Sequence, residues 1–118
     1  MADEDRSSGN FWLSQCRSQR TTDLLSCYAY IKGVIGGHSD GMARMWVRAV
    51  TLMPKGQVLP ITPKGFTFCL PDSVVNEQVR DIFVSFLQAN PAQRHELGSK
   101  LLVDSLIKAF PCPDTTTK

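Results

Sequence analysis

Three cysteine segments decide the fold of this chain: Cys27-Tyr28-Ala29-Tyr30-Ile31-Lys32-Gly33, Phe68-Cys69-Leu70-Pro71 and Ala109-Phe110-Pro111-Cys112. With Cys16, these segments place every cysteine in or at the edge of a predicted helix. A disulfide between such positions would join two helices, and one that closes a short loop typically contributes about 2–4 kcal/mol to stability. The cysteines therefore predict a small crosslinked helical bundle and favour an oxidising compartment.

The spacing of the four cysteines favours one pairing. Cys16 and Cys27 flank the polar turn predicted between the first two helices, so they would face each other across a helical hairpin. Cys69 lies about as far before Asn90 as Cys112 lies after it, and an antiparallel helix pair folding at Asn90 would bring both sulfurs to one end. We predict Cys16–Cys27 and Cys69–Cys112, while the other two connectivities remain open.

The apolar pattern of the 118 residues predicts an all-α fold, a bundle of four to five helices with one long loop. We expect a single domain over residues 8–113, between disordered tails at 1–7 and 114–118. Gly36-Gly37 is expected to end the second helix, and Asp40 to cap a third that reaches Val50. The core is expected to come from stripes in five helices, among them Leu24, Cys27, Ile31, Met42, Met45, Trp46, Ala49, Val75, Val79, Phe83, Leu87, Leu97, Leu101, Leu102 and Leu106.

Small residues recur every four positions along the second predicted helix, at Ala29, Gly33 and Gly37. Glycine inside a helix costs about 0.8–1.0 kcal/mol relative to alanine, so Gly33 needs a reason in packing or in a kink. We expect another helix to pack closely on this line, rather than a phosphate to bind there, because no glycine-rich loop follows a strand.

A long segment from Met53 to Phe68 contains three prolines and cannot continue a helix. Loops of this length are often functional in compact domains, so residues 54–65 are the first candidate contact surface. The side chains expected to enter a partner's cleft are Lys55, Val58, Leu59, Ile61 and Lys64. A loop that packs over the bundle, with or without a short hairpin, is the alternative.

Several classes of function are disfavoured by the sequence. Two cysteines never stand at Cys-x-x-Cys spacing, and His38 and His95 are isolated, so we expect no metal, no cofactor and no catalytic residues. The basic residues are scattered without an aromatic platform, so nucleic acid is not an expected partner. Apolar runs fall short of the roughly 18 residues that cross a membrane.

The ordered motifs resemble the Rap/Tai immunity proteins, which neutralise peptidoglycan amidase effectors of bacterial type VI secretion systems. The family's Cys-x-Gly-Tyr-Ile-x-Gly is similar to Cys27–Gly33, with Ala29 in place of the glycine. Its Cys-x-Pro and Phe-Pro-Cys are similar to 69–71 and 110–112, and its Tyr/Phe-Leu-x-x-x-Pro to 86–91. Residues 38–68 align with no motif of the family, and partner specificity is expected there.

The resemblance implies an all-helical periplasmic protein, often dimeric, that serves in bacterial competition by blocking the cleft of a cell-wall amidase with a protruding loop. Trp46 and Tyr30 would be natural anchors if exposed. The acidic start Met1-Ala2-Asp3-Glu4-Asp5 is unlike a secretory signal. For an exported protein we therefore expect that the signal peptide has been removed and that Met1 comes from cloning.

Two other functions fit a small, disulfide-bonded helical domain. The first is a periplasmic acid-stress chaperone, which would become monomeric and expose apolar surface at low pH. The second is a structural helical domain unrelated to any toxin. Tight binding to one partner at neutral pH separates the immunity function from both.

Overall fold

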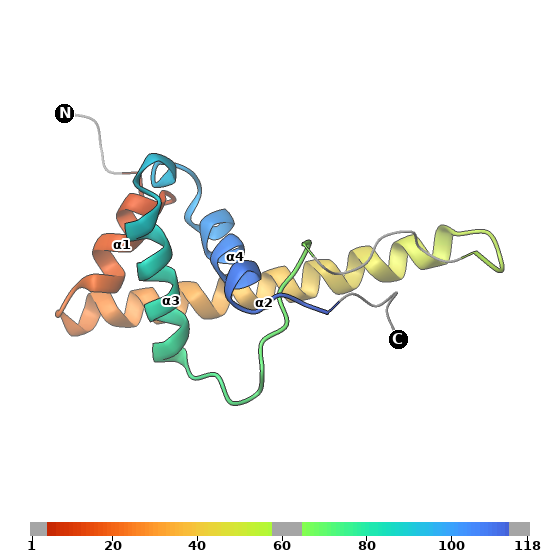
Figure 1. The fold of residues 1–118 in the computed structure, drawn as a ribbon, viewed down its shortest axis with the longest axis horizontal. Helices are drawn as coiled ribbons and strands as arrows, with labels where there is room; N and C mark the ends of the chain where they lie inside the picture. The colour runs from red at the N-terminus through yellow and green to blue at the C-terminus, as the bar shows by residue number, and fades with distance from the viewer. Residues whose placement is uncertain (1–4, 58–64, 114–118) are drawn as a thin grey trace.

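The computed structural model describes residues 5–57 and 65–113, and these ranges form four α-helices and one short 3-10 helix. The elements are α1 (Gly9–Arg17), α2 (Thr21–Leu52), α3 (Asn76–Ala89), η1 (Pro91–Gln93) and α4 (Gly98–Ala109). Helices α1, α3 and α4 gather around the N-terminal half of α2, and the rest of α2 extends past them (Figure 1). The prediction of an all-α, disulfide-stapled bundle is confirmed.

Local sequence sets the helix ends. The Ser8 hydroxyl accepts a hydrogen bond from the backbone N–H of Phe11 at 3.2 Å and so caps α1. In the first turn of α2, the Asp23 carboxylate accepts a hydrogen bond from the Ser18 hydroxyl at 2.7 Å, where a negative charge also suits the helix dipole. Prolines follow the other ends: Pro54 lies just beyond α2, Pro91 beyond α3 and Pro111 beyond α4.

One boundary prediction is wrong, because α2 runs without a break through Gly36-Gly37 and Asp40. Positive φ angles at glycine are found at Gly56 and Gly65 among the described residues, so neither glycine of the pair adopts the left-handed conformation that would end a helix. Asp40 instead pairs within the helix with Arg44, at 2.8 Å between Oδ2 and Nε. The two predicted helices are one helix of 32 residues.

The expected close packing on the small-residue line is also wrong. A Cβ added at Gly33 or Gly37 would meet no atom within 4 Å, and the same holds for Gly36 and Gly41. Helix α4 leaves an open groove at Gly33 and Gly37, with Ser99 and Lys100 on its far side. The glycines that do carry close contacts are Gly9 and Gly98, where α1 meets α4.

The core lies where all four helices meet. Phe83 and Leu87 of α3 and Leu101, Leu102 and Leu106 of α4 are buried against Trp12 of α1 and Ile31 of α2. Val75 and Leu97 were expected in these stripes, but both are more than half exposed because they precede the first residues of α3 and α4. The two C-terminal apolar stripes therefore face each other as predicted, apart from their first members.

Both predicted disulfides are present. Cys16–Cys27 crosslinks α1 to α2 across the short turn between them. Cys69–Cys112 ties the segment before α3 to the segment after α4, and the backbone N–H of Cys69 donates to the carbonyl of Phe110 at 2.9 Å beside it. Thus one crosslink joins α1 to α2, and the other closes the segment that contains α3 and α4. In the described part of the chain no helix is both long and apolar enough to span a membrane.

Candidate partner-binding surface

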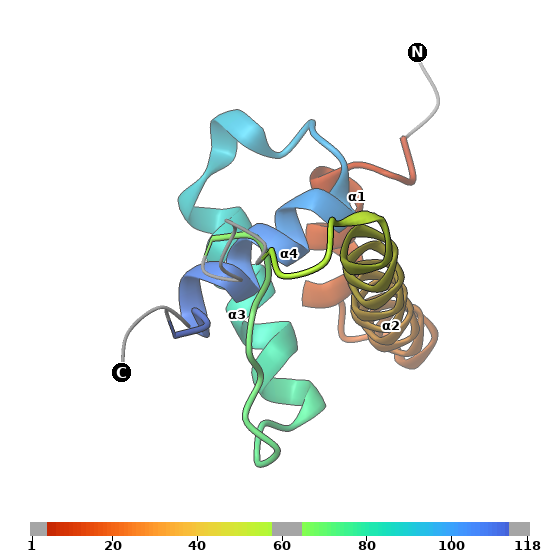
Figure 2. The same cartoon turned by 90° about the vertical axis from the view of Figure 1, so that its right-hand side faces the viewer.

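The C-terminal part of α2 leaves the bundle after His38. The members of α2 that belong to the core or pack against it end at Ile35. His38 then contacts the segment before α3: its Nε2 lies 2.9 Å from the Thr67 hydroxyl, and its ring stacks on Phe68 at 5.1 Å. We call residues 39–52 the distal arm. Figures 1 and 2 show it projecting from the bundle, end-on in the second view.

The apolar stripe of the distal arm was predicted to be core, and this is wrong. Met45 is 55% exposed and Trp46 is 44% exposed, while Met42 and Ala49 are half-buried. The stripe does continue the core-facing line of Cys27, Ile31 and Ile35 along the helix. Met45 and Trp46 stay exposed because α1, α3 and α4 do not reach that far along α2 (Figure 1).

Three further apolar residues of the arm were missed by the sequence reading. Val47 is 64% exposed, Val50 51% and Leu52 67%. A signal was available, since residues 45–53 are apolar on almost every side of a helix. A helix that is apolar all round is normally buried, so one that projects from its own domain indicates a surface made for a partner.

The predicted contact residues divide between described and undescribed parts of the chain. Trp46 lies on the distal arm, and Lys55 is exposed three residues beyond the end of α2. Val58, Leu59, Ile61 and Lys64 lie outside the described residues. Phe66, on the far side of that gap, is 55% exposed and was not predicted.

Basic charge accompanies the apolar surface. Arg44, Arg48 and Lys55 lie on or next to the arm, against the single acid Asp40. Arg44 and Asp40 form an exposed ion pair, 80% and 66% exposed, which contributes little to stability. Arg48 and Lys55 form no ion pair with any residue in the described ranges. The surface is thus apolar with a positive edge.

Tyr30, the other proposed anchor, has a structural position instead. Its ring stacks on Trp12 with centroids 3.8 Å apart, and its hydroxyl hydrogen-bonds with Ser99 of α4. Burial raises the pKa of Tyr30, and the bond with Ser99 opposes this only in part. Tyr30 therefore helps to hold α1, α2 and α4 together.

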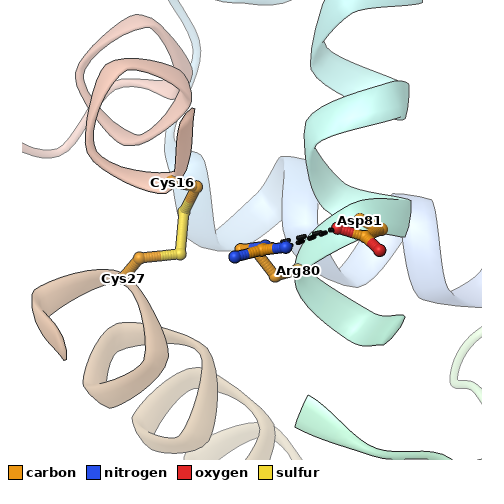
Figure 3. A network of polar contacts seen from close by, with 4 residues as sticks. All are labelled: Cys16, Cys27, Arg80 and Asp81. Carbon is orange, nitrogen blue, oxygen red and sulfur yellow. Dashed lines mark hydrogen bonds and ion pairs between the residues drawn. A yellow bond between two sulfur atoms is a disulfide. The ribbon is translucent and has the colours of Figure 1, made fainter. Parts of the chain in front are cut away.

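A second group of polar residues lies beside the first disulfide. Arg80 reaches from α3 towards Cys16–Cys27, and its Nη2 lies 3.0 Å from Oδ1 of Asp81 (Figure 3). Its guanidinium also lies 5.7 Å from the centre of the Tyr28 ring, so it links α3 to α2 by a cation–π contact. An open groove of about 610 Å³ here has Arg17 and Gln19 as further lining residues. Because the guanidinium of Arg80 already contacts both Asp81 and Tyr28, we interpret this cluster as structural.

The histidines and acids do not assemble into a reactive centre in the part of the chain that is described. No three His, Cys, Asp or Glu side chains come together there as a metal site would require. His38 is engaged with Thr67 and Phe68, and His95 is exposed next to η1. The feature that stands out among the described residues is the exposed apolar surface of the distal arm.

A comparison with protein families identifies the family of this chain. Residues 8–112 match the family model described as Rap1a immunity proteins. That range covers most of the chain and includes all four cysteines, the bundle and the distal arm. No curated protein matches the chain.

Proposed function

Because the chain belongs to the Rap1a immunity protein family, we propose that it binds and inhibits a peptidoglycan amidase effector of a type VI secretion system. An immunity protein of this kind binds an effector protein. The single observation that carries the proposal is the family match over residues 8–112. The exposed apolar surface with its basic edge is compatible with it, because a protein partner would cover such a surface.

The proposed location is the periplasm. A wall-cleaving effector has to be blocked where its substrate is, and both cysteine pairs of this chain are oxidised. Disulfides persist outside the cytoplasm, in compartments such as the bacterial periplasm. The two crosslinks also keep the bundle rigid, which limits the conformational entropy lost on docking.

The proposed mechanism is steric. The loop that carries Lys55, Val58, Leu59, Ile61 and Lys64 enters the cleft of the amidase and excludes its substrate. Both ends of this loop are attached to fixed structure. Before the loop the chain forms α2. After it, Thr67 contacts His38 and Cys69 is crosslinked to Cys112. Inhibition by occlusion needs no chemistry from the inhibitor, so the protein acts as a ligand and not as an enzyme.

A homodimer is part of the proposal and comes from the resemblance to the family. Light scattering coupled to size-exclusion chromatography measures it directly, with a mass near twice 13.1 kDa expected. A measured mass equal to that of one chain would refute the predicted dimer but not the proposed inhibition.

The test of function is a titration at neutral pH. The amidase encoded nearest this gene is assayed on purified peptidoglycan with increasing amounts of the protein. Stoichiometric loss of cleavage is the expected result. An amidase that neither binds nor is inhibited would refute the proposed function.

The test of the loop uses the triple variant Val58→Asp, Leu59→Asp and Ile61→Asp. We expect it to lose inhibition while its circular dichroism and melting temperature stay at wild-type values. Leu25→Asp is the control, because Leu25 is 63% exposed near the other end of α2. Unchanged inhibition by the triple variant would remove the loop from the mechanism.

One observation favours a second candidate, a periplasmic acid-stress chaperone. The exposed apolar side chains of the distal arm are the kind of surface that binds unfolded clients. A chaperone would suppress the aggregation of several unrelated proteins at low pH. An immunity protein would bind one effector tightly at neutral pH and leave such aggregation unchanged.

A further inference from the structure

The exposed apolar side chains of the distal arm cover more than half of the helix circumference. At 3.6 residues per turn, Leu52, Met45, Trp46, Val50 and Val47 follow one another around an arc of about 220°. Each of them is at least 44% exposed. The polar residues between positions 42 and 52 are Arg44, Arg48 and Thr51, and they share one narrow strip. Residues 42–52 of the arm therefore form an apolar arc with one polar strip, and within this arc Met42 and Ala49 are half-buried.

The width of this arc limits what can cover it. A helix that packs on a flat surface buries a stripe of roughly 100° or somewhat more. A flat partner that covered Trp46 would leave either Leu52 or Val47 in water, since these lie at opposite ends of the arc. Only a groove with two walls contacts the whole arc at once, as in complexes where an amphipathic helix lies in an apolar groove.

The basic residues of the arm indicate which charge the rim of that groove should carry. Arg48 lies on the polar strip, and Lys55 lies just beyond the end of the helix, neither of them neutralised by a described residue. Acidic side chains along the rim would complement both. The arm of a second copy would present a convex helix surface instead of a groove with two walls.

We propose that the distal arm is a helical docking element that inserts into an apolar, acid-rimmed groove of the partner, separate from the loop that blocks the cleft. This inference rests on the proposed function, in which the partner is the amidase effector. The arm supplies affinity through Trp46 and its apolar neighbours, and the loop supplies inhibition. The groove has to accept three helical turns, about 16 Å of helix.

The first experiment measures binding of the nearest-encoded amidase by isothermal titration calorimetry. The test variant is Val47→Glu, and the matched control is Leu25→Glu: the two positions lie on the same helix and are 64% and 63% exposed. Glutamate forms helices at least as well as valine or leucine does, so helix propensity is not lost. We expect Val47→Glu to weaken binding by at least about 30-fold, the loss typical of an interface hot spot, with Leu25→Glu near wild type.

The second experiment avoids any change of charge. A photo-crosslinking amino acid is placed at position 47 or at position 25, and the complex is irradiated. Crosslinks to the amidase are expected from position 47 alone. Arg48→Glu, compared with Arg48→Lys, tests the rim: we expect weaker binding and a smaller dependence on salt for the glutamate variant only.

The outcomes separate this inference from the proposed function. If the wild-type protein does not bind the amidase, the proposed function fails and the docking element fails with it. If the wild type binds but Val47→Glu binds equally well and position 47 gives no crosslink, the docking element alone is wrong. If Val47→Glu converts a dimer into a monomer and keeps its affinity for the amidase, the arm is an interface between copies and the inference is overturned.

Discussion

The two halves of α2 have similar apolar sequences and different surroundings. On the core-facing line of the first half, Cys27 and Ile31 are at most 1% exposed, whereas on the same line in the distal arm Met45 is 55% exposed and Trp46 is 44% exposed. The helical period is the same in both halves, so periodicity indicates which face is apolar but not what covers that face. Burial depends on where the neighbouring helices end. The comparison teaches that one continuous helix can be core at one end and exposed apolar surface at the other.

The largest expected difference between the halves is in the effect of removing an aromatic side chain. Phe83 is fully buried against the first half of α2, and Phe83→Ala should lower the free energy of unfolding by about 3–5 kcal/mol. Trp46→Ala removes a larger side chain from the arm but should cost less than about 1 kcal/mol, because much of Trp46 is already in water. Urea denaturation measures both. Equal losses would mean that the arm is packed as the bundle is.

The disulfides give the next largest effect, and they act on the bundle alone. They enclose sequence separations of 43 residues for Cys69–Cys112 and 11 for Cys16–Cys27. Loss of the longer crosslink should cost about 4 kcal/mol and loss of the shorter about 3 kcal/mol on the chain-entropy model. Paired alanine variants, compared by chemical denaturation, check the order. The reverse order would show that native-state packing outweighs loop entropy here.

The smallest expected effects come from two glycine-to-alanine variants, which should change stability in opposite directions. A Cβ at Gly9 in the bundle would lie 2.5 Å from a methyl carbon of Leu101 and 3.0 Å from the Arg94 carbonyl oxygen, so Gly9→Ala should destabilise by about 1–3 kcal/mol. Gly36 lies in a helix with open space around it, so Gly36→Ala should stabilise by up to about 1 kcal/mol. Thermal melts of the two variants are the measurement. A lower melting temperature for Gly36→Ala would contradict the open environment of that glycine.

Much of the bundle could be predicted from sequence because its signals are local. Pro91 and Pro111 end helices wherever they occur, Ser8 caps α1, and the cysteine spacing identified both disulfides. The Gly36-Gly37 boundary was wrong for an energetic reason. Two glycines cost a helix only about 2 kcal/mol, and a helix already fixed by Cys27 and Ile31 tolerates that cost.

The candidate surface was predictable only in part. Trp46 and Lys55, the predicted contact residues that are described, are exposed, although Trp46 was also placed in the core stripe with Met45. Val47, Val50 and Leu52 were passed over. Their exposure depends on the length of α2 relative to α3 and α4, which no short sequence motif encodes. The contact roles of Val58, Leu59, Ile61 and Lys64 remain predictions, since these residues lie outside the described ranges.

The clamp formed by Cys69–Cys112 has a consequence for how such a protein can diversify. Cys69 is crosslinked to the chain after α4, and its backbone N–H is bonded to Phe110, so the chain re-enters the bundle at a fixed point. Doubling the length of a flexible loop costs only about 0.6 kcal/mol in closure entropy. We therefore expect the sequence between Met53 and Thr67 to accept insertions, deletions and exchange with relatives while the scaffold folds unchanged. If the proposed contact role of this segment holds, partner specificity can change while the scaffold stays the same.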